Sequence, residues 1–452
     1  MLVSEEMKAH YQKNIKIPKL IKIFFLILLA SLISLTCSDD EPVSLAYVEE
    51  DLVSRFKLET LGSIPYPADN PPRYERIALG RLLFYDPILS GEKDVSCGTC
   101  HHPDFGFADG RQLPVGTSGV GLGPNRILTS SSISGLPIDF TPRNAPTIYN
   151  TAYNLDEFGI PSHNGIQFWD GRINSLEKQA SKPIGSRVEM RGDAYPGSDE
   201  QAAAVALDSV INRLRKIDEY VVRFRVAFPL ESGEWNAGIR EHVIDSSTYV
   251  RAIGSFEREI VAINSPYDRF VYGENDALNK IQKKGLELFY TKAKCFTCHS
   301  GPMFSDFSFV LQGVPQEGPG KEIIPGDDTG REEHTKNPVD RYKFRTASLR
   351  NIELTAPYMH DGVFATLYEV VKFYNDGCIP RHPQISDEMM GPKLIEPLEL
   401  TEDEIIAIVE FMKALTDEGT RLQHYLLTVP EAVPSGLMPV FGWRGAGIGR
   451  IK

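Results

Sequence analysis

Four of the six cysteines fall in two identical spacings, and each spacing is closed by a histidine. The two motifs are Cys97-Gly98-Thr99-Cys100-His101 and Cys295-Phe296-Thr297-Cys298-His299. In this spacing the two sulfurs can add across the vinyl groups of a haem while the adjacent histidine nitrogen binds the iron. A thioredoxin-like dithiol or half of a zinc site would leave the repeated histidine unexplained. The sequence therefore predicts two covalently attached haems of the c type.

The other two cysteines have different surroundings. Cys378 has no motif around it and is interpreted as a lone buried thiol without a role. Cys37 follows scattered lysines and the apolar run 23–35, which is shorter than the roughly 20 residues of a membrane-spanning helix. The segment resembles a lipoprotein export signal, so we expect a periplasmic or cell-envelope protein that is tethered to a membrane by a lipid on Cys37. An ordinary cleaved signal with an incidental cysteine is the alternative.

The length of 452 residues with 42% hydrophobic content indicates two domains rather than one. The expected segments are an export signal at 1–37, a linker at 38–60, an N-terminal haem domain at 61–265, a C-terminal haem domain at 266–425 and a tail at 426–452. The formal charge is −13, from 48 basic and 61 acidic residues, and no basic tract follows the signal. This balance argues against a nucleic-acid partner. Acidic stretches such as Asp327-Asp328 and Glu402–Glu404 are interpreted as solvated surface.

Related segments precede the two motifs. Gly80–Tyr85 comes shortly before the first motif and the similar Gly285–Tyr290 shortly before the second, which indicates a duplicated unit of helix and haem. Near the end, Thr401 and Glu404 form a capping box ahead of apolar residues at helical spacing, so an amphipathic helix is expected there.

Periodicity elsewhere also favours helices and loops over sheets. The stretches 202–225 and 249–261 have no strand alternation and are expected to be helical. Residues 116–141 are rich in Gly, Ser and Pro, so they predict a long loop. The expected fold class is therefore mostly α with long functional loops.

The order of these motifs resembles the bacterial diheme cytochrome c peroxidases and their relative, the diheme enzyme that matures methylamine dehydrogenase. The similarity runs from about Tyr74 to Leu437. Its specific marks are the blocks Pro142–Pro146, Gln167–Arg172, Val188–Met190 and Ala356–Gly362. The resemblance implies two cytochrome c-like helical haem domains, of which the N-terminal one is peroxidatic and the C-terminal one transfers electrons.

Further residue roles follow from the resemblance. Trp169 matches a tryptophan between the two haems that carries electrons or holes. Gln179 and Glu189 match the pair above the open face of the first haem, where a carboxylate can move a proton between peroxide oxygens and an amide can steady the intermediate. Asn144 and the backbone oxygens of Thr355 and Pro357 match a site for one calcium ion, which prefers oxygen ligands. Without this resemblance, Trp169 would be interpreted as a core aromatic, and Gln179 and Glu189 as surface residues.

Two departures from the typical peroxidase concern the iron ligands. The segment 103–162 contains no histidine that could serve as a second ligand of the first iron. This iron is therefore expected to be five-coordinate. His102 adjoins the proximal ligand and is badly placed to reach the opposite face, and His163 is interpreted as a plain loop histidine.

At the second haem, Tyr374 stands where the typical peroxidase has methionine and where the methylamine dehydrogenase maturase has tyrosine. A phenolate ligand would lower the potential of that haem. Tyr374 also fits the buried face of an amphipathic helix, in which case Met359 or Met303 would be the ligand.

Three functions are compatible with this pattern. The first is reduction of hydrogen peroxide at the first haem, with electrons relayed through the second haem from a small donor protein such as a cytochrome or cupredoxin. The second is maturase-like oxidation of a protein or organic substrate through a high-valent diheme state. The third is electron transfer without catalysis, and Gln179 and Glu189 beside an open iron argue against it.

Overall fold

Helices and long loops make up the described part of the chain. The computed structural model describes residues 51–195, 198–231, 243–318, 327–417 and 425–440, and every element below belongs to the compact unit Leu52–Lys452. The expected export signal and Cys37 lie outside the described residues. The α-helices are α2 (Leu52–Phe56), α3 (Tyr74–Phe84), α4 (Cys97–Cys100), α5 (Leu176–Gln179), α6 (Lys182–Gly185), α7 (Asp199–Arg215), α8 (Asp218–Ala227), α9 (Ser246–Arg258), α10 (Pro266–Val271), α11 (Lys280–Tyr290), α12 (Glu332–Thr335), α13 (Leu367–Asn375), α14 (Pro392–Ile395) and α15 (Glu402–Lys413).

The strands of the described residues are short. β1 (Gly119–Val120) pairs antiparallel with β2 (Ile127–Leu128), and β3 (Phe309–Val310) pairs antiparallel with β4 (Phe344–Arg345). A π-helix, η6, covers Arg187–Arg191. The prediction of a mostly α fold is therefore confirmed.

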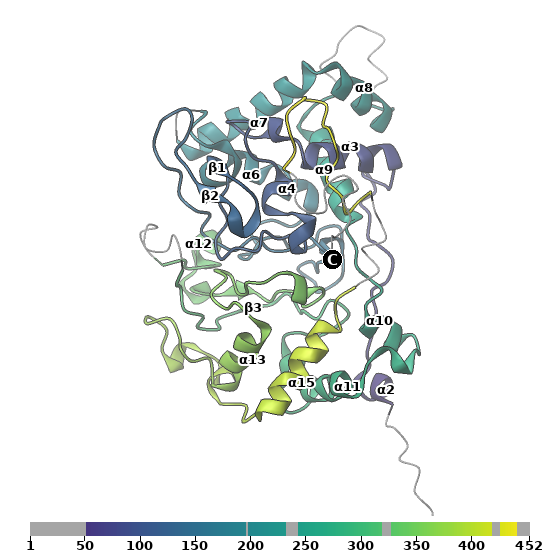
Figure 1. Cartoon of the computed structure of the whole chain (residues 1–452), viewed down its shortest axis with the longest axis vertical. Coiled ribbons are helices and arrows are strands. Elements are labelled where there is room, and N and C mark those ends of the chain that lie inside the picture. Colours follow the sequence, from purple (N-terminus) through teal and green to yellow (C-terminus); the bar gives the residue numbers. More distant parts are fainter. Residues whose placement is uncertain (1–50, 196–197, 232–242, 319–326, 418–424, 441–452) are drawn as a thin grey trace, which may run out of the picture. The chain divides into compact units, whose positions relative to one another are not determined.

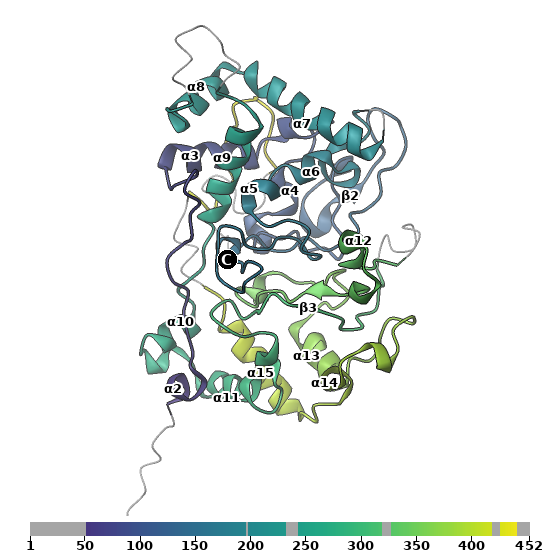
Figure 2. The same ribbon diagram turned by 180° about the vertical axis from the view of Figure 1, so that it is seen from behind.

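Two helix pairs repeat one packing arrangement. α3 lies against α9 and α11 lies against α15 (Figure 2). A Cβ atom at Gly80 of α3 would lie 1.9 Å from the carbonyl oxygen of Ala252, and one at Gly285 of α11 would lie 1.9 Å from that of Ala407. Only glycine allows backbones to approach this closely. Each pair thus crosses at a glycine, and its first helix, α3 or α11, is followed along the chain by a Cys-x-x-Cys-His motif, as expected for a duplicated unit.

Each helix pair has its own hydrophobic core. The first core gathers residues of α3, α7, α8 and α9, with Leu83, Phe84, Phe224 and Phe256 fully buried. The second core gathers residues of α11, α13 and α15, with Leu286, Ile408 and Phe411 fully buried. The structure therefore contains two packing centres in one unit.

The ends of the described chain cross between these cores. α2 and Leu58, from the start of the described chain, pack on the second core. After α15 the chain returns to the first core, where Leu426 and Val433 are buried beside the helix pair α3 and α9 (Figure 1). Each core therefore contains a segment from the other end of the chain, which ties the two halves together.

The capping box of Thr401 and Glu404 starts α15 as expected, but two other expected elements differ from the observed ones. The stretch 202–225 is not one helix, because Ile217 adopts an extended conformation and separates α7 from α8. The expected loop 116–141 carries the short hairpin of β1 and β2, which is too small to show periodicity.

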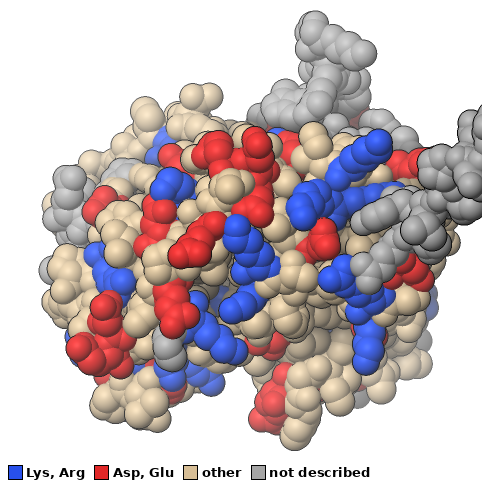
Figure 3. Space-filling view, turned by 90° about the horizontal axis from the view of Figure 1, so that it is seen from below, with Lys and Arg blue, Asp and Glu red and all other residues tan. Residues whose placement is uncertain are grey.

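The face seen from below in Figure 1 carries acidic and basic side chains together (Figure 3). Exposed side chains of opposite charge pair between elements, such as Arg55 of α2 with Glu287 of α11 at 3.4 Å and Lys292 with Glu404 at 2.6 Å. Exposed pairs of this kind contribute about 0–1 kcal/mol each.

Among the described residues, every helix is too short or too polar to span a membrane.

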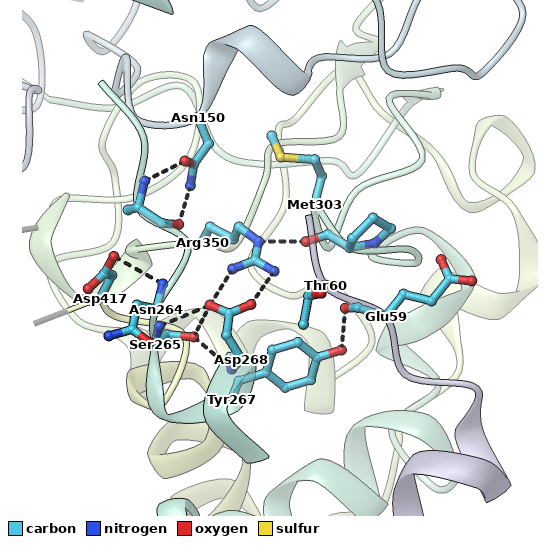
Figure 4. A network of polar contacts seen from close by, with 12 residues as sticks. Glu59, Thr60, Asn150, Asn264, Ser265, Tyr267, Asp268, Met303, Arg350 and Asp417 are labelled. Carbon is cyan, nitrogen blue, oxygen red and sulfur yellow. Dashed lines mark hydrogen bonds and ion pairs between the residues drawn. The ribbon is translucent and has the colours of Figure 1, made fainter. Parts of the chain in front are cut away.

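A buried ion pair anchors the loop behind the second motif. Arg350 donates two hydrogen bonds of 2.9 Å to the carboxylate of Asp268 on α10, and both side chains are almost fully buried. The guanidinium also donates to the carbonyl oxygen of Pro302, three residues after His299 (Figure 4). Because a bidentate pair fixes direction as well as distance, it sets the position of this loop.

Candidate functional site

Both motif histidines are oriented by a backbone carbonyl. The Nδ1 atom of His101 lies 3.1 Å from the carbonyl oxygen of Phe107, and that of His299 lies 2.9 Å from the carbonyl oxygen of Phe304. A carbonyl can only accept, so Nδ1 carries the hydrogen and Nε2 has its lone pair free for a metal. Burial lowers the pKa of both imidazoles, which favours this neutral form. Both imidazoles thus present a free Nε2 lone pair, as a metal-binding histidine requires.

A cavity of about 510 Å³ lies beside the first motif. This volume is in the range of about 300–1,000 Å³ typical of ligand and cofactor sites. The predicted site residues among its lining are Cys97, Cys100, His101, Asn144, Trp169, Gln179 and Glu189. A cavity of this size that is faced by both thiols and by the imidazole fits a covalently held haem.

Glu189 reaches the cavity from the π-helix η6, a type of helix found often at functional sites. Its carbonyl oxygen accepts from the backbone N–H of Thr117 at 2.8 Å, and that of Met190 accepts from Gly91 at 2.7 Å. A Cβ at Gly116 would lie 2.4 Å from the Glu189 carbonyl oxygen, so glycine lets this loop approach closely. Burial raises the pKa of the Glu189 carboxyl, and the charge of Arg172 opposes this shift. Glu189 is therefore a buried carboxyl on a well-anchored backbone, with its pKa shifted towards the protonated form.

Gln179 and Trp169 line the same cavity from other elements. Gln179 is the last residue of α5, which Ser175 caps. Trp169 donates from its indole Nε1 to the carbonyl oxygen of Asn144 at 2.9 Å, and its own carbonyl oxygen accepts from the N–H of Arg345 at 2.8 Å. Arg345 belongs to β4, so Trp169 is fixed between residues from both halves of the chain.

Asn144, one of the expected calcium ligands, contacts the second half of the chain. The backbone N–H of Asn144 donates to the carbonyl oxygen of His360 at 2.7 Å, and its side-chain Nδ2 donates to that of Arg111 at 2.7 Å. Oδ1 remains as the acceptor of this amide. Thr355 and Pro357 come just before His360 in the sequence and do not line the cavity.

An ion-pair network at the edge of the cavity corrects one interpretation from the sequence. Arg143 contacts Asp170 at 2.6 Å, Asp328 at 2.7 Å and Glu333 at 2.9 Å. Asp328 is buried, so the interpretation of Asp327-Asp328 as solvated surface is wrong for this residue. Burial raises its pKa, but the hydrogen bond and charge of Arg143 outweigh that effect and bring the pKa to about 2. The sequence could not show this because the two partners are far apart in the chain.

The second motif has different neighbours, and Cys295, Cys298 and His299 do not line the cavity. Tyr374 of α13 packs beside Cys378. Burial raises the pKa of the Tyr374 phenol well above its usual value, and the nearby thiols of Cys378, Cys298 and Cys295 raise it further. Tyr374 is therefore close to the second motif.

The two methionines considered as alternative ligands are placed differently. Met359 packs in the same cluster as Tyr374. Met303 is only 2% exposed and packs in a separate cluster that includes Tyr153 and Phe307.

Some cavity residues were not identified from the sequence. Among them are Glu257, His334 and Arg345, while Arg172 belongs to a block noted in the sequence but was given no role. His334 and Arg345 come from the second half, so no local pattern predicts them. Glu257 could have been noticed in the sequence, because it follows Ile253 by four residues and so places a carboxyl on the apolar face of α9. His163 does not line the cavity.

Comparison with known proteins identifies relatives along most of the chain. A family model described as di-haem cytochrome c peroxidase matches residues 74–276. Cytochrome-c peroxidase IdrP1 of Pseudomonas sp. (strain SCT) is 33% identical over 383 residues, which cover 79% of this chain and 85% of that protein. Methylamine utilization protein MauG of Methylorubrum extorquens is 32% identical over 387 residues, which cover 85% and 90%. The crystal structure of a MauG-like protein associated with microbial copper homeostasis aligns with a TM-score of 0.61 and 30% identity, covering 80% of this chain and 95% of that one.

Proposed function

We propose, because this chain belongs to the di-haem cytochrome c peroxidase family of oxidoreductases, that it reduces hydrogen peroxide in the cavity beside His101. The observation that carries this proposal is the shared cavity of the first motif, Gln179 and Glu189. Bound haem would supply an iron that binds peroxide and passes electrons to it. Cys97 and Cys100 would attach this haem, and Nε2 of His101 would hold its iron.

In this proposal Glu189 moves a proton within the bound peroxide. Its carboxylate would accept a proton from one peroxide oxygen and donate it to the other. The Gln179 amide donates a hydrogen bond that orients the peroxide. The backbone hydrogen bonds around η6 support this role, because they fix the backbone from which the Glu189 side chain enters the cavity.

The second motif would receive electrons from a small donor protein such as a cytochrome or cupredoxin. Cys295 and Cys298 would attach a second haem, and His299 with Tyr374 would hold its iron. The closeness of Tyr374 to both thiols supports this ligand pair. Trp169 would carry electrons to the first haem, and its bonds to Asn144 and Arg345 support a position between the halves.

Further proposals concern the domains, the calcium ion and the location of the protein. The two cores support a peroxidatic haem domain at 61–265 and an electron-transfer haem domain at 266–425. The contact of Asn144 with His360 supports one calcium ion held by Asn144, Thr355 and Pro357. The pattern before Cys37 supports export to the periplasm or cell envelope with a lipid anchor.

A second candidate function is oxidation of a protein or organic substrate. The position of Tyr374 favours it, because a phenolate ligand stabilises oxidised iron. In this reading peroxide removes electrons from the protein, and Trp169 shares the resulting charge.

Steady-state peroxide consumption distinguishes the two functions. The as-isolated protein receives hydrogen peroxide and a generic reduced cytochrome, without prior reduction of its own haems. Fast turnover supports peroxide reduction. Slow turnover with a long-lived oxidised protein supports substrate oxidation. The open first site predicts a high-spin ferric signal before peroxide is added, and two low-spin signals alone would contradict it.

A further inference from the structure

The cavity contains a second buried carboxyl, on α9. Glu257 is 5% exposed and lines the cavity together with Ile253, which lies one turn earlier on the same helix face. α9 packs against α5, whose Leu176, Gln179 and Ala180 line the cavity beside it. Glu257 therefore shares a wall of the cavity with Gln179.

The neighbourhood of Glu257 leaves its carboxyl without a charge partner. Arg258, whose charge acts on Glu257, is paired with Glu177 of α5 at 2.8 Å, so this guanidinium is already bound to another carboxylate. Within the described residues the Oε2 atom of Glu257 is buried and has no hydrogen-bond partner. The other titratable groups whose charges are coupled to it are Cys97 of α4 and Tyr249 of α9.

These surroundings keep the carboxyl protonated at neutral pH. Burial and, to a smaller extent, the charge of Glu177 raise the pKa of Glu257, the charge of Arg258 lowers it, and together they bring it to about 8. A buried carboxyl that is neutral and unpaired can release and regain a proton near physiological pH.

Glu177 provides a contrast within the same pair of helices. Its carboxylate accepts hydrogen bonds from Asn70 and Arg258, and it does not line the cavity. This is the pattern of a structural carboxylate, since every buried charge is paired. Glu257 differs in both respects, because its Oε2 atom accepts no hydrogen bond from the described residues and its side chain lines the cavity.

We propose that Glu257 is a second proton-exchanging carboxyl of this cavity, which supplies one of the protons consumed by peroxide reduction. This inference rests on the proposed function. Reduction of one hydrogen peroxide to two waters consumes two electrons, which the reduced donor protein supplies, and two protons. Glu189 moves a proton from one peroxide oxygen to the other and so supplies none in net terms. Glu257 gives its carboxyl proton to the cavity, and a proton from solvent replaces it after each turnover.

The first test follows the protonation of Glu257 without any turnover. Infrared difference spectra of the haem-loaded wild type, Glu257→Gln and Glu259→Gln are recorded between about pH 6 and pH 10. Glu259 is the matched control, because it lies on the same helix turn and binds Tyr66 but does not line the cavity. The wild type and E259Q should lose a protonated-carboxyl band with a midpoint near 8, and E257Q should lack this band. A spectrum of E257Q that titrates like the wild type overturns the proposal.

The second test is the pH profile of peroxide turnover. In the wild type kcat should fall as pH rises through about 8, since the donor form of Glu257 is lost there. E257Q should be slower by roughly 10²-fold at pH 7, at the low end of the effect of a general acid, and should lack the alkaline fall. Unchanged kcat and an unchanged profile in E257Q overturn the inference. A wild type that does not reduce peroxide at all refutes the proposed function instead.

Folding of the variant is controlled separately. If E257Q does not load haem, Glu257→Asp is used in its place. This variant keeps the carboxyl and withdraws it by one methylene from the cavity. Its infrared midpoint and the alkaline limb of its kcat profile should then shift together. A shift of the midpoint without a shift of the kinetic limb overturns the proposal.

Discussion

The two Cys-x-x-Cys-His motifs are alike in their local structure and differ in what surrounds them. In both, the histidine Nδ1 is directed at a backbone carbonyl, and in both a helix with a glycine crossing precedes the motif. The first motif faces a 510 Å³ cavity with Glu189, Gln179 and Glu257, and the second lies near the phenol of Tyr374. The shared part can hold a haem, and only the surroundings can make one site reactive and the other closed.

The difference is also one of buried charge. Around the first motif, Glu189 and Glu257 have raised pKa values because burial outweighs the opposing charges of Arg172 and Arg258. Behind the second motif, the buried carboxylate of Asp268 is paired with Arg350. A buried carboxyl with a raised pKa can exchange a proton, whereas breaking a buried ion pair leaves an uncompensated charge and destabilises the fold. The contrast predicts that variants at the two sites will fail in different ways.

Removal of each attachment motif should have the largest effect and should separate the sites completely. Cys97→Ser with Cys100→Ser should abolish cyanide binding to the ferric protein, because the open site is lost. Cys295→Ser with Cys298→Ser should leave cyanide binding intact while donor-driven peroxide turnover disappears. Haem content and cyanide titration of both double variants test this. Cyanide binding that survives in the first variant would break the comparison.

Replacement of Glu189 should have the next largest effect. Glu189→Gln should reduce peroxide turnover by roughly 10²–10⁴-fold while both haems stay attached, because the proton carrier is lost. Wild-type activity should rise with pH through the raised pKa of Glu189, since only the ionised form accepts a proton. The exposed Glu157 provides the control variant Glu157→Gln, which should be unaffected. Equal rates for the two variants would remove Glu189 from the mechanism.

Loss of the buried ion pair between Arg350 and Asp268 should lower the stability of the protein, and of the two haem sites it should perturb only the second. Arg350→Met leaves the Asp268 carboxylate buried and unpaired, which should cost about 3–5 kcal/mol in the free energy of unfolding. The spectral change should be confined to the second haem, because Arg350 also holds the Pro302 carbonyl near His299. Denaturant unfolding and haem spectra measure both effects. Arg341→Met, at an exposed pair with Glu332, should cost about 0–1 kcal/mol, and similar losses in the two variants would contradict the assignment.

The sequence predicted the local parts of this architecture better than the long-range parts. The motifs, the duplicated helix and the capping box at Thr401 depend on neighbouring residues, and the structure contains each of them. The partnership of Arg143 with Asp328 and the return of Leu426 to the first core depend on the tertiary fold. No spacing in the chain encodes them.

Within the site, the resemblance to a known family was needed for Gln179 and Glu189. Neither residue lies in a pattern that shows which way its side chain points, and only the structure brings both to the cavity. Glu257 was missed for another reason. It interrupts an apolar helix face, and such a residue is significant only when the face is known to line a cavity.

The smallest expected effects come from the glycine crossings, and they test whether the two halves are equivalent as frameworks. Gly80→Ala and Gly285→Ala each place a Cβ 1.9 Å from a carbonyl oxygen of the partner helix, so the helices must move apart. We expect each to lose about 1–3 kcal/mol from overpacking, partly offset by roughly 1 kcal/mol of helix propensity. Gly62→Ala is the control, because its Cβ would meet nothing within 4 Å. Denaturant unfolding should show equal losses for the first two and little change for the third, and a clearly unequal pair would mean that the two haem sites differ in their frameworks as well as in their surroundings.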